Sequence, residues 1–200
     1  MQFQNLVKDV RLYIRLEGAE VESRIKSFIN DACLRFARLA EFRHLIQSAT
    51  LTTDNSGSYD ISDIVPEPFV SDMMLLVQGT TPSEKVDYLD YIQSGSPSGQ
   101  WTIFGGQLHV AGTGSDFTFI YTSTGSPYPM VEPTDENVAA TYYPDIIKQI
   151  AIVRYLNYLG DLDASSIEFS ELNKLIAELK KSENRAQKEG RTLRVSTHNR

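Results

Sequence analysis

The side chains that most often bind metals or act as nucleophiles are few in this sequence and far apart. Histidine occurs only at His44, His109 and His198, and the single cysteine is Cys33. The histidines do not have the HxxxH or HxxE spacing that brings ligands to one helix face, and a lone cysteine excludes an internal disulfide and a four-thiolate zinc site. The sequence therefore indicates neither a metal centre nor a catalytic triad, and we interpret Cys33 as a small core or helix-side residue.

Two short motifs resemble a nucleophile elbow and a calcium-binding loop, but each lacks residues that the site requires. The segment GSPSG at 95–99 has Pro97 where a nucleophile elbow needs serine. Asp161 opens a stretch that mimics a calcium loop, but its sixth position is Ser166 instead of glycine and its twelfth is Leu172 instead of glutamate. We interpret this stretch as a helix cap, and the glycine-rich stretches, which contain no GxGxxG, as turns.

Neighbouring carboxylates and a group of aromatic residues also have simpler explanations than a site. Asp87 with Asp90, or Glu132 with Asp135 and Glu136, could do acid–base work, but acid-rich loops of an acidic protein are usually only solvated. The aromatic residues could form a sugar-binding face, although packing in the core or against another subunit is favoured. They are Tyr88, Tyr91, Trp101, Phe104, Phe117, Phe119 and Tyr121.

Charge is distributed unevenly along the chain. The 200 residues carry a net charge of -7, yet residues 180–200 contain seven basic and two acidic side chains. Residues 43–179 contain five basic and 18 acidic side chains. The middle therefore repels polyanions, whereas the end attracts a polyanion or an acidic protein surface. Because residues 180–200 have no aromatic side chain for base stacking, a protein partner is favoured over nucleic acid.

Apolar residues at helical spacing predict two helices at the start of the chain. The first follows Asn5 as a possible N-cap and ends at Gly18. The second is long and amphipathic, with apolar residues every three or four positions from Val21 to Leu39 and charged residues on its other faces.

Two further helices are predicted near the end of the chain. The third has Pro144 at its first position and ends at Gly160. The fourth follows a capping box formed by Ser165 and Glu168. Its apolar stripe ends at Leu179, so we expect the residues beyond it to order only on a partner.

Between the helical pairs, β-branched and aromatic residues separated by turn residues predict a β block. Residues 50–61 are expected to form two short strands about a turn, and residues 69–79 a buried strand. Residues 101–112 predict a hairpin with a Gly-Gly turn, and residues 116–123 a further strand. Residues 86–92 fit either a strand or one helical turn.

This order of elements predicts an α+β fold, mainly a helical bundle with an inserted small antiparallel β subdomain. The expected division is residues 1–48 for the N-terminal helices, 49–125 for the β subdomain, 126–142 for a linker, 143–179 for the C-terminal helices and 180–200 for a basic extended or helical tail.

Four segments follow one another along the chain: LVKDVRLYIRLEGAEVESRIKSFINDACLRFARLAEFRHL, then GSYDISDIVPEPFVSDMMLL, then WTIFGGQLHV leading into FTFIYTS, and YYPDIIKQIAIVRYLNYLGDLDASSIEFSELNKLIAELKKSENRAQ. In this order they resemble the head-to-tail connector proteins of tailed phages, and in particular the adaptor proteins that form a ring beneath the portal. The resemblance includes Tyr-Asp-Ile followed by Pro, x-Ile-x-Gly-x-x-Leu in the hairpin and Pro-Asp-x-Ile at the third helix. It covers about residues 1–190.

The resemblance implies a structural virion protein and no enzyme, cofactor or catalytic residue. Such adaptors form rings, usually of twelve copies, that dock on the portal protein, continue the DNA channel and meet the tail or the next connector protein. The expected location is the neck of the virion, after assembly in the host cytoplasm, with genomic DNA passing through transiently. No apolar run suggests a signal peptide or membrane span.

In such adaptors the C-terminal segment commonly reaches the portal, which suggests a use for the basic tail. The expected portal-binding residues are Lys180, Lys181, Arg185, Lys188, Arg191, Leu193, Arg194 and Val195. We further expect the second and third helices to form the subunit interface, with Arg24, Arg35 and Arg38 pairing with acidic residues of a neighbour; the alternative is that these arginines are ordinary solvated residues. Acidic residues of the middle segment, where they line the channel, would repel DNA phosphates.

Two other functions remain open on the residues alone. A carbohydrate- or protein-binding module could use the β subdomain, and a hydrolase, which the sequence favours less, would need a cleft in which His, Asp or Ser side chains converge.

Overall fold

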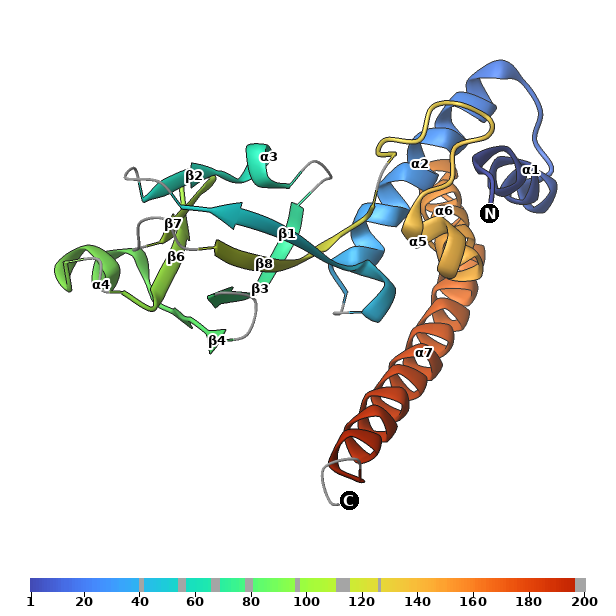
Figure 1. The fold of residues 1–200 in the computed structure, drawn as a ribbon. Helices are drawn as coiled ribbons and strands as arrows, with labels where there is room; N and C mark the ends of the chain where they lie inside the picture. The colour runs from blue at the N-terminus through green and yellow to red at the C-terminus, as the bar shows by residue number, and fades with distance from the viewer. Residues whose placement is uncertain are drawn as a thin grey trace. The chain divides into compact units, whose positions relative to one another are not determined.

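The computed structural model describes residues 1–39, 42–53, 57–65, 69–77, 81–95, 98–110, 116–125 and 127–196 (Figure 1). The helices are α1 (Phe3–Ile14), α2 (Ala19–Ala37), α3 (Ile61–Ile64), α4 (Tyr88–Gln93), α5 (Val138–Tyr142), α6 (Pro144–Leu159) and α7 (Leu162–Ser196), with a 3₁₀ turn η1 (Arg43–Leu45). The strands are β1 (Ile46–Thr52), β2 (Ser58–Asp60), β3 (Phe69–Val77), β4 (Thr81–Pro82), β5 (Glu84–Lys85), β6 (Gln100–Phe104), β7 (Gln107–Val110) and β8 (Asp116–Ser123). The fold is α+β, as the sequence predicts.

The chain divides into two compact units. The helical unit consists of Met1–Arg43 with Pro129–Arg200, and the β unit is His44–Tyr128. The helical unit therefore joins the two ends of the chain, because the β unit is inserted between α2 and α5.

Helix α6 forms the centre of the helical unit. Eight of its 16 residues are buried, and they occur on several sides of the helix: Ile146, Ile147, Ile150, Ala151, Ile152, Val153, Tyr155 and Leu156. A helix that is apolar all round has to be covered on several sides. Helices α1, α2 and α7 all pack against it. At its N-terminal end, Tyr143 packs on Phe36 and Phe42, whose rings stack with centroids 4.5 Å apart.

The ends of α6 follow the predicted signals, whereas the start of α7 does not. Pro144 is the first residue of α6, and Gly160 ends it in the left-handed region with φ of 77°. Helix α7 begins three residues before the predicted capping box, because Asp161 Oδ1 accepts the Ala164 N–H at 3.1 Å. Ser165 is consequently inside the helix, where its hydroxyl donates to Asn157 Oδ1 at 2.9 Å.

Helix α7 is much longer than the helix that it packs against. It has 35 residues, against 16 in α6. At 1.5 Å per residue, the two lengths are about 52 Å and about 24 Å, so α6 can cover only about half of α7. Figure 1 shows the C-terminal half of α7 continuing past α6. The backbone of the predicted basic tail is thus helical as far as Ser196.

The β unit contains two four-stranded sheets in its described residues. One sheet has the strand order β1-β8-β3-β4, and the other has the order β2-β7-β6-β5. The predicted hairpin is present as β6 and β7, with Gly105 and Gly106 at φ of 61° and 82°, values that favour glycine at both turn positions. The two strands predicted within residues 50–61 exist, but they belong to different sheets.

Side chains from both sheets form the core of the β unit. Trp101, Leu108 and Val110 come from one sheet, and Leu75 and Phe119 come from the other. The Trp101 ring lies edge-on to Phe119, with centroids 6.1 Å apart. For residues 86–92 the helical alternative is correct, because α4 forms there and packs on β6.

Among the described residues, each helix is too short or too polar to cross a membrane.

The central position of α6 predicts the effect of truncating one of its side chains. Ile147 is completely buried. Ile147→Ala should lower the free energy of unfolding by about 2–5 kcal/mol, since it leaves a cavity in a packed interior. The measurement is urea denaturation of the full chain, followed by the helical circular dichroism signal. The control Leu162→Ala, at a site 68% exposed, should stay within about 0.5 kcal/mol of the wild type. If both changes lowered the free energy of unfolding equally, the placement of α6 at the centre of the helical unit would be contradicted.

Candidate interaction surfaces

One face of α2 carries the arginines that the sequence analysis selected. Arg24, Arg35 and Arg38 are separated by eleven and three positions, which places them within one stripe of a helix with 3.6 residues per turn. The guanidinium of Arg24 lies 4.0 Å from the centre of the Tyr158 ring on α6 and forms an ion pair with Glu20 at 3.3 Å. Its charge is therefore already partly matched within the chain.

Asp31 lies between two arginines. Its Oδ2 is 2.8 Å from the Nε of Arg35, in a hydrogen bond, and 2.8 Å from the Nε of Arg154 on α6, in an ion pair without hydrogen-bond geometry. The Arg154 guanidinium also lies 5.4 Å from the centre of the Phe28 ring. One carboxylate thus faces two guanidinium groups, and one positive charge is left over.

Beside these arginines, a groove of about 390 Å³ runs along α6 between side chains of α2 and α7. Its lining residues are Arg35, Leu39, Ile150, Val153, Arg154, Asn157, Phe169, Leu172, Asn173 and Ile176. Leu39 is 43% exposed and Phe169 is 51% exposed. Arg38, at the end of α2, is exposed as well. Apolar side chains next to arginines are the combination enriched in the centres of protein interfaces. We call this surface the arginine groove, consisting of the lining residues and Arg38.

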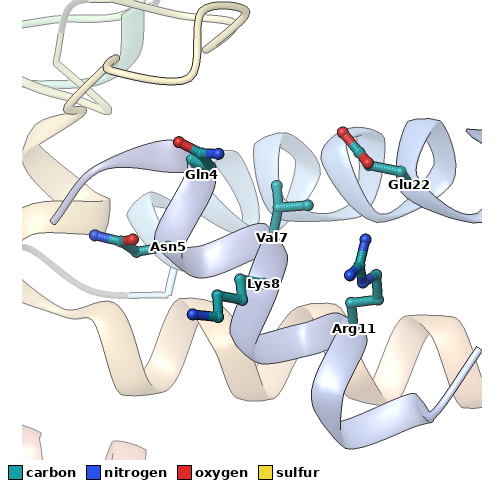
Figure 2. Close-up of a pocket in the computed structure, with 6 residues that line it drawn as sticks. All are labelled: Gln4, Asn5, Val7, Lys8, Arg11 and Glu22. Carbon is teal, nitrogen blue, oxygen red and sulfur yellow. The ribbon is translucent and has the colours of Figure 1, made fainter. Parts of the chain in front are cut away.

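A second hollow lies between α1 and α2 and is more polar. Figure 2 shows its lining residues, which are Gln4, Asn5, Val7, Lys8, Arg11 and Glu22. Its volume is about 350 Å³. The hydrogen bond from Lys26, at 2.9 Å, holds the pKa of Glu22 below its usual range, so the carboxylate stays charged. Only Val7 is apolar among the lining residues, which makes this hollow a weaker candidate for protein binding.

A third surface is the acidic segment, residues 131–136. Its neighbour Met130 is buried, and Asn30 of α2 binds both the N–H and the carbonyl of Met130, at 2.8 and 3.0 Å. Asp135 Oδ2 accepts the N–H groups of Val131 and Glu132 at 2.7 and 2.8 Å. The backbone of α1 adds two hydrogen bonds, from Phe3 and Gln4. The segment is therefore held in one conformation.

The side chains that the acidic segment presents to solvent are apolar and acidic. Val131 is 65% exposed, and Glu132 and Glu136 are exposed. From the sequence alone, these acidic residues are expected to form a solvated loop. The structure gives one of them, Asp135, the additional role of capping this turn.

The basic tail residues are placed on α7. Lys180, Lys181 and Arg185 are exposed. The side chains of Lys188, Arg191, Leu193, Arg194 and Val195 lie outside the part of the chain whose side chains the structure describes, although their backbone belongs to α7.

An ion pair continues the inner stripe of α7 into this basic region. The stripe contains Leu172, Leu175, Ile176 and Leu179, and its next position is Glu183. The Glu183 side chain is 8% exposed, and its Oε1 lies 3.5 Å from the Nε of Arg43. From the sequence alone the stripe ends at Leu179, because a glutamate is not expected in a core when its partner is unknown.

Another glutamate of α7 connects three helices. Glu168 Oε1 accepts a hydrogen bond from the hydroxyl of Tyr13 on α1, and Glu168 Oε2 accepts one from Gln149 Nε2 on α6 at 2.5 Å. The hydrogen bond to Glu168 raises the pKa of Tyr13 to about 12. The phenol therefore remains protonated and able to donate throughout the neutral range.

The other residues that could do chemistry do not converge. In the described part of the chain, no three His, Cys, Asp or Glu side chains are placed to hold a metal ion. His109 lies on β7 beside the Tyr88 ring, His44 lies in η1, and His198 falls outside the described residues. Most of the aromatic residues considered for sugar binding are buried: Tyr91, Trp101, Phe117, Phe119 and Tyr121. Phe104, with Tyr88 stacked on it, is the exposed exception.

The comparison with protein families identifies the class of this protein. Residues 1–196 match the model of the SU10 adaptor protein family, so the chain belongs to this family. It is a family of phage head-to-tail adaptors, as the resemblance implied, and it is structural and not an enzyme family. The protein therefore has a structural adaptor role in the phage neck, in association with portal and tail components. A search of curated proteins gave no match.

The burial of Cys33 predicts its reactivity. Burial raises the pKa of its thiol to about 12, so the reactive thiolate is absent from the folded chain near neutral pH. Ellman's reagent at pH 8 should leave the native protein unmodified and should label one thiol after denaturation, when the pKa returns to about 8.5. A Val131→Cys variant should react rapidly at its exposed site and serves as the positive control. Equally rapid labelling of the native wild type would contradict the placement of Cys33.

Proposed function

We propose that this chain forms a closed ring beneath the portal, joins the portal to the tail and continues the DNA channel between them. The observation that carries this proposal is the exposed surface of the helical unit, in a chain that belongs to a structural adaptor family. That surface combines arginines, aromatic rings and leucine side chains around the arginine groove. Arginine and aromatic side chains are enriched where proteins associate. A ring requires that one surface of each copy meet a different surface of the next.

In this proposal, the subunit interface includes the stripe of Arg24, Arg35 and Arg38. Arg24 and Arg35 have acidic partners within the chain, so they would add to the contact mainly through their planar faces and remaining N–H donors. Arg38 has no ion pair among the described residues, which makes it the strongest candidate for a charge pair across the interface.

The basic half of α7 would bind the portal. Residues 180–200 have an excess of five positive charges, and Lys180, Lys181 and Arg185 point into solvent from a helix. An exposed basic helix suits an acidic protein surface through charge complementarity. Of the two expected forms of the tail, extended or helical, α7 has the helical one as far as Ser196. A helical segment would lose less entropy on binding than a disordered one.

Acidic residues of the β unit would help DNA to pass where they line the channel. Its described residues include one lysine, Lys85, which is paired with Asp72 at 2.7 Å. Six acidic side chains in the same unit are exposed: Asp60, Asp63, Glu84, Asp87, Asp90 and Asp116. A negative wall repels phosphates and prevents the genome from binding to it.

The first test is native mass spectrometry of the full-length chain with the portal ring of the same phage. We expect a complex of one portal ring with a closed ring of adaptor copies, twelve if the resemblance holds. A variant that ends after Arg185 should bind the portal at least about tenfold more weakly, since it loses four of the seven basic side chains of residues 180–200. This end point keeps Glu183 and its contact with Arg43, so the fold is preserved.

A full-length variant tests the tail without deletion. Lys180→Glu, Lys181→Glu and Arg185→Glu together should reduce portal binding as strongly as the truncation, because all three side chains are exposed. The same charge change at Lys8, Arg11 and Arg15, which are exposed residues at or next to α1, is the matched control and should leave portal binding unchanged. Unaltered binding by both tail variants would reject the portal-binding role of the tail.

A further inference from the structure

We propose that the acidic segment of one copy docks in the arginine groove of the next copy. This inference rests on the proposed ring and names the two surfaces that would form its repeated contact. The occupant of the groove is a second copy of this chain.

The two surfaces lie on different sides of the same helix. Arg35 lines the groove, whereas the acidic segment is anchored beside Asn30, through Met130. Five positions at about 100° per residue separate Asn30 from Arg35 by about 140° around α2. A chain therefore cannot place its acidic segment in its own groove. Two complementary surfaces that face different directions produce a heterologous contact, which is the type that closes into a ring.

Charge complementarity favours this pairing. In the groove, Arg35 and Arg154 face the single carboxylate of Asp31, and Arg38 adds another positive charge at the rim. The groove thus has two positive charges in excess. The acidic segment presents two exposed carboxylates, those of Glu132 and Glu136. Pairing of the two surfaces would balance the charges within a partly desolvated contact.

The apolar parts of the two surfaces also match. Val131 is 65% exposed although it lies next to a buried residue, Met130. The groove offers Leu39 and Phe169 at its edges and the buried Leu172 deeper in, and it has room for side chains in its volume of about 390 Å³. Placing Val131 there would remove apolar surface from water on both partners.

The acidic segment is also preorganised for binding. The contacts of Asn30 and Asp135, together with the backbone hydrogen bonds from α1, hold its conformation. A segment that is already ordered loses little conformational entropy on docking. Its rigidity also fixes the direction in which the next copy is added.

Cysteine cross-linking tests the contact directly. Val131→Cys and Asn173→Cys place one thiol on each surface, both at exposed positions, while the native Cys33 is buried. With both changes in one full-length chain assembled on the portal ring, a short bis-maleimide should give a ladder of covalent adaptor oligomers. Either single variant should give no covalent dimer, and a mixture of the two single variants should give dimers and nothing larger.

The other outcomes overturn the inference in distinguishable ways. A ring whose copies are confirmed by native mass but give no ladder would reject this contact and leave the proposed function standing. Covalent dimers from one single variant would indicate a symmetric contact, and cross-links from Asn173→Cys to the portal would assign the groove to the portal. Failure of any ring to form on the portal would reject the proposed function and this inference together.

Charge exchange gives an independent test. Glu132→Lys with Glu136→Lys, or Arg35→Glu with Arg38→Glu, should each reduce ring assembly on the portal by at least about tenfold, because like charges then meet. A chain with all four changes should recover assembly. Glu171→Lys with Glu178→Lys, at exposed sites on α7, is the matched control and should assemble normally. Assembly unaffected by the first two variants, or no recovery in the fourfold variant, would contradict the pairing.

Discussion

The helical unit depends on the burial of α6. Because half of its residues, on several sides, are buried, the helices from both ends of the chain have to meet around it. Helices α1, α2 and α7 all pack against α6, and Glu168 joins α1, α6 and α7 through its two carboxylate oxygens. The arginine groove follows from the same constraint, since α2 and α7 contribute side chains on either side of α6 and leave part of it accessible. The arginine groove is thus a result of the way in which α2 and α7 cover α6.

The β unit has a separate core. Residues of both sheets, with Trp101 and Phe119 among them, fill it, and this accounts for most of the aromatic residues that could otherwise have suggested a sugar-binding face. The exposed charged side chains of its described residues are mainly acidic, with Lys85 as the exception. The two units therefore differ in their surfaces, one having arginines beside apolar side chains and the other having carboxylates. This division suits the proposed ring, in which subunit contact and passage of DNA would make separate demands on the surface.

Local patterns were sufficient for much of the fold. The proline and glycine that bound α6, the Gly-Gly turn of the hairpin and the amphipathic stripe of α2 each act through neighbouring residues, so the sequence predicted them. The interpretation of the Asp161 stretch as a helix cap was correct, whereas the capping box at Ser165 was wrong as the start of α7, because Asp161 caps the helix first. The inner stripe of α7 was ended too early, since Glu183 is buried through a contact with Arg43, which is 140 positions away in the chain.

By itself, the sequence determined the α+β class, the positions of most elements, the uneven charge and the resemblance to phage adaptors, because these depend on composition, periodicity and the order of local motifs. Only the tertiary structure decided that Arg154 also pairs with Asp31, and which surfaces lie on different sides of α2. It also decided that the acidic residues 131–136 belong to an ordered segment, which is anchored by the contact of Asn30 with Met130. The physical reason is that these features arise from contacts between residues distant in the chain, whose approach is set by packing around α6.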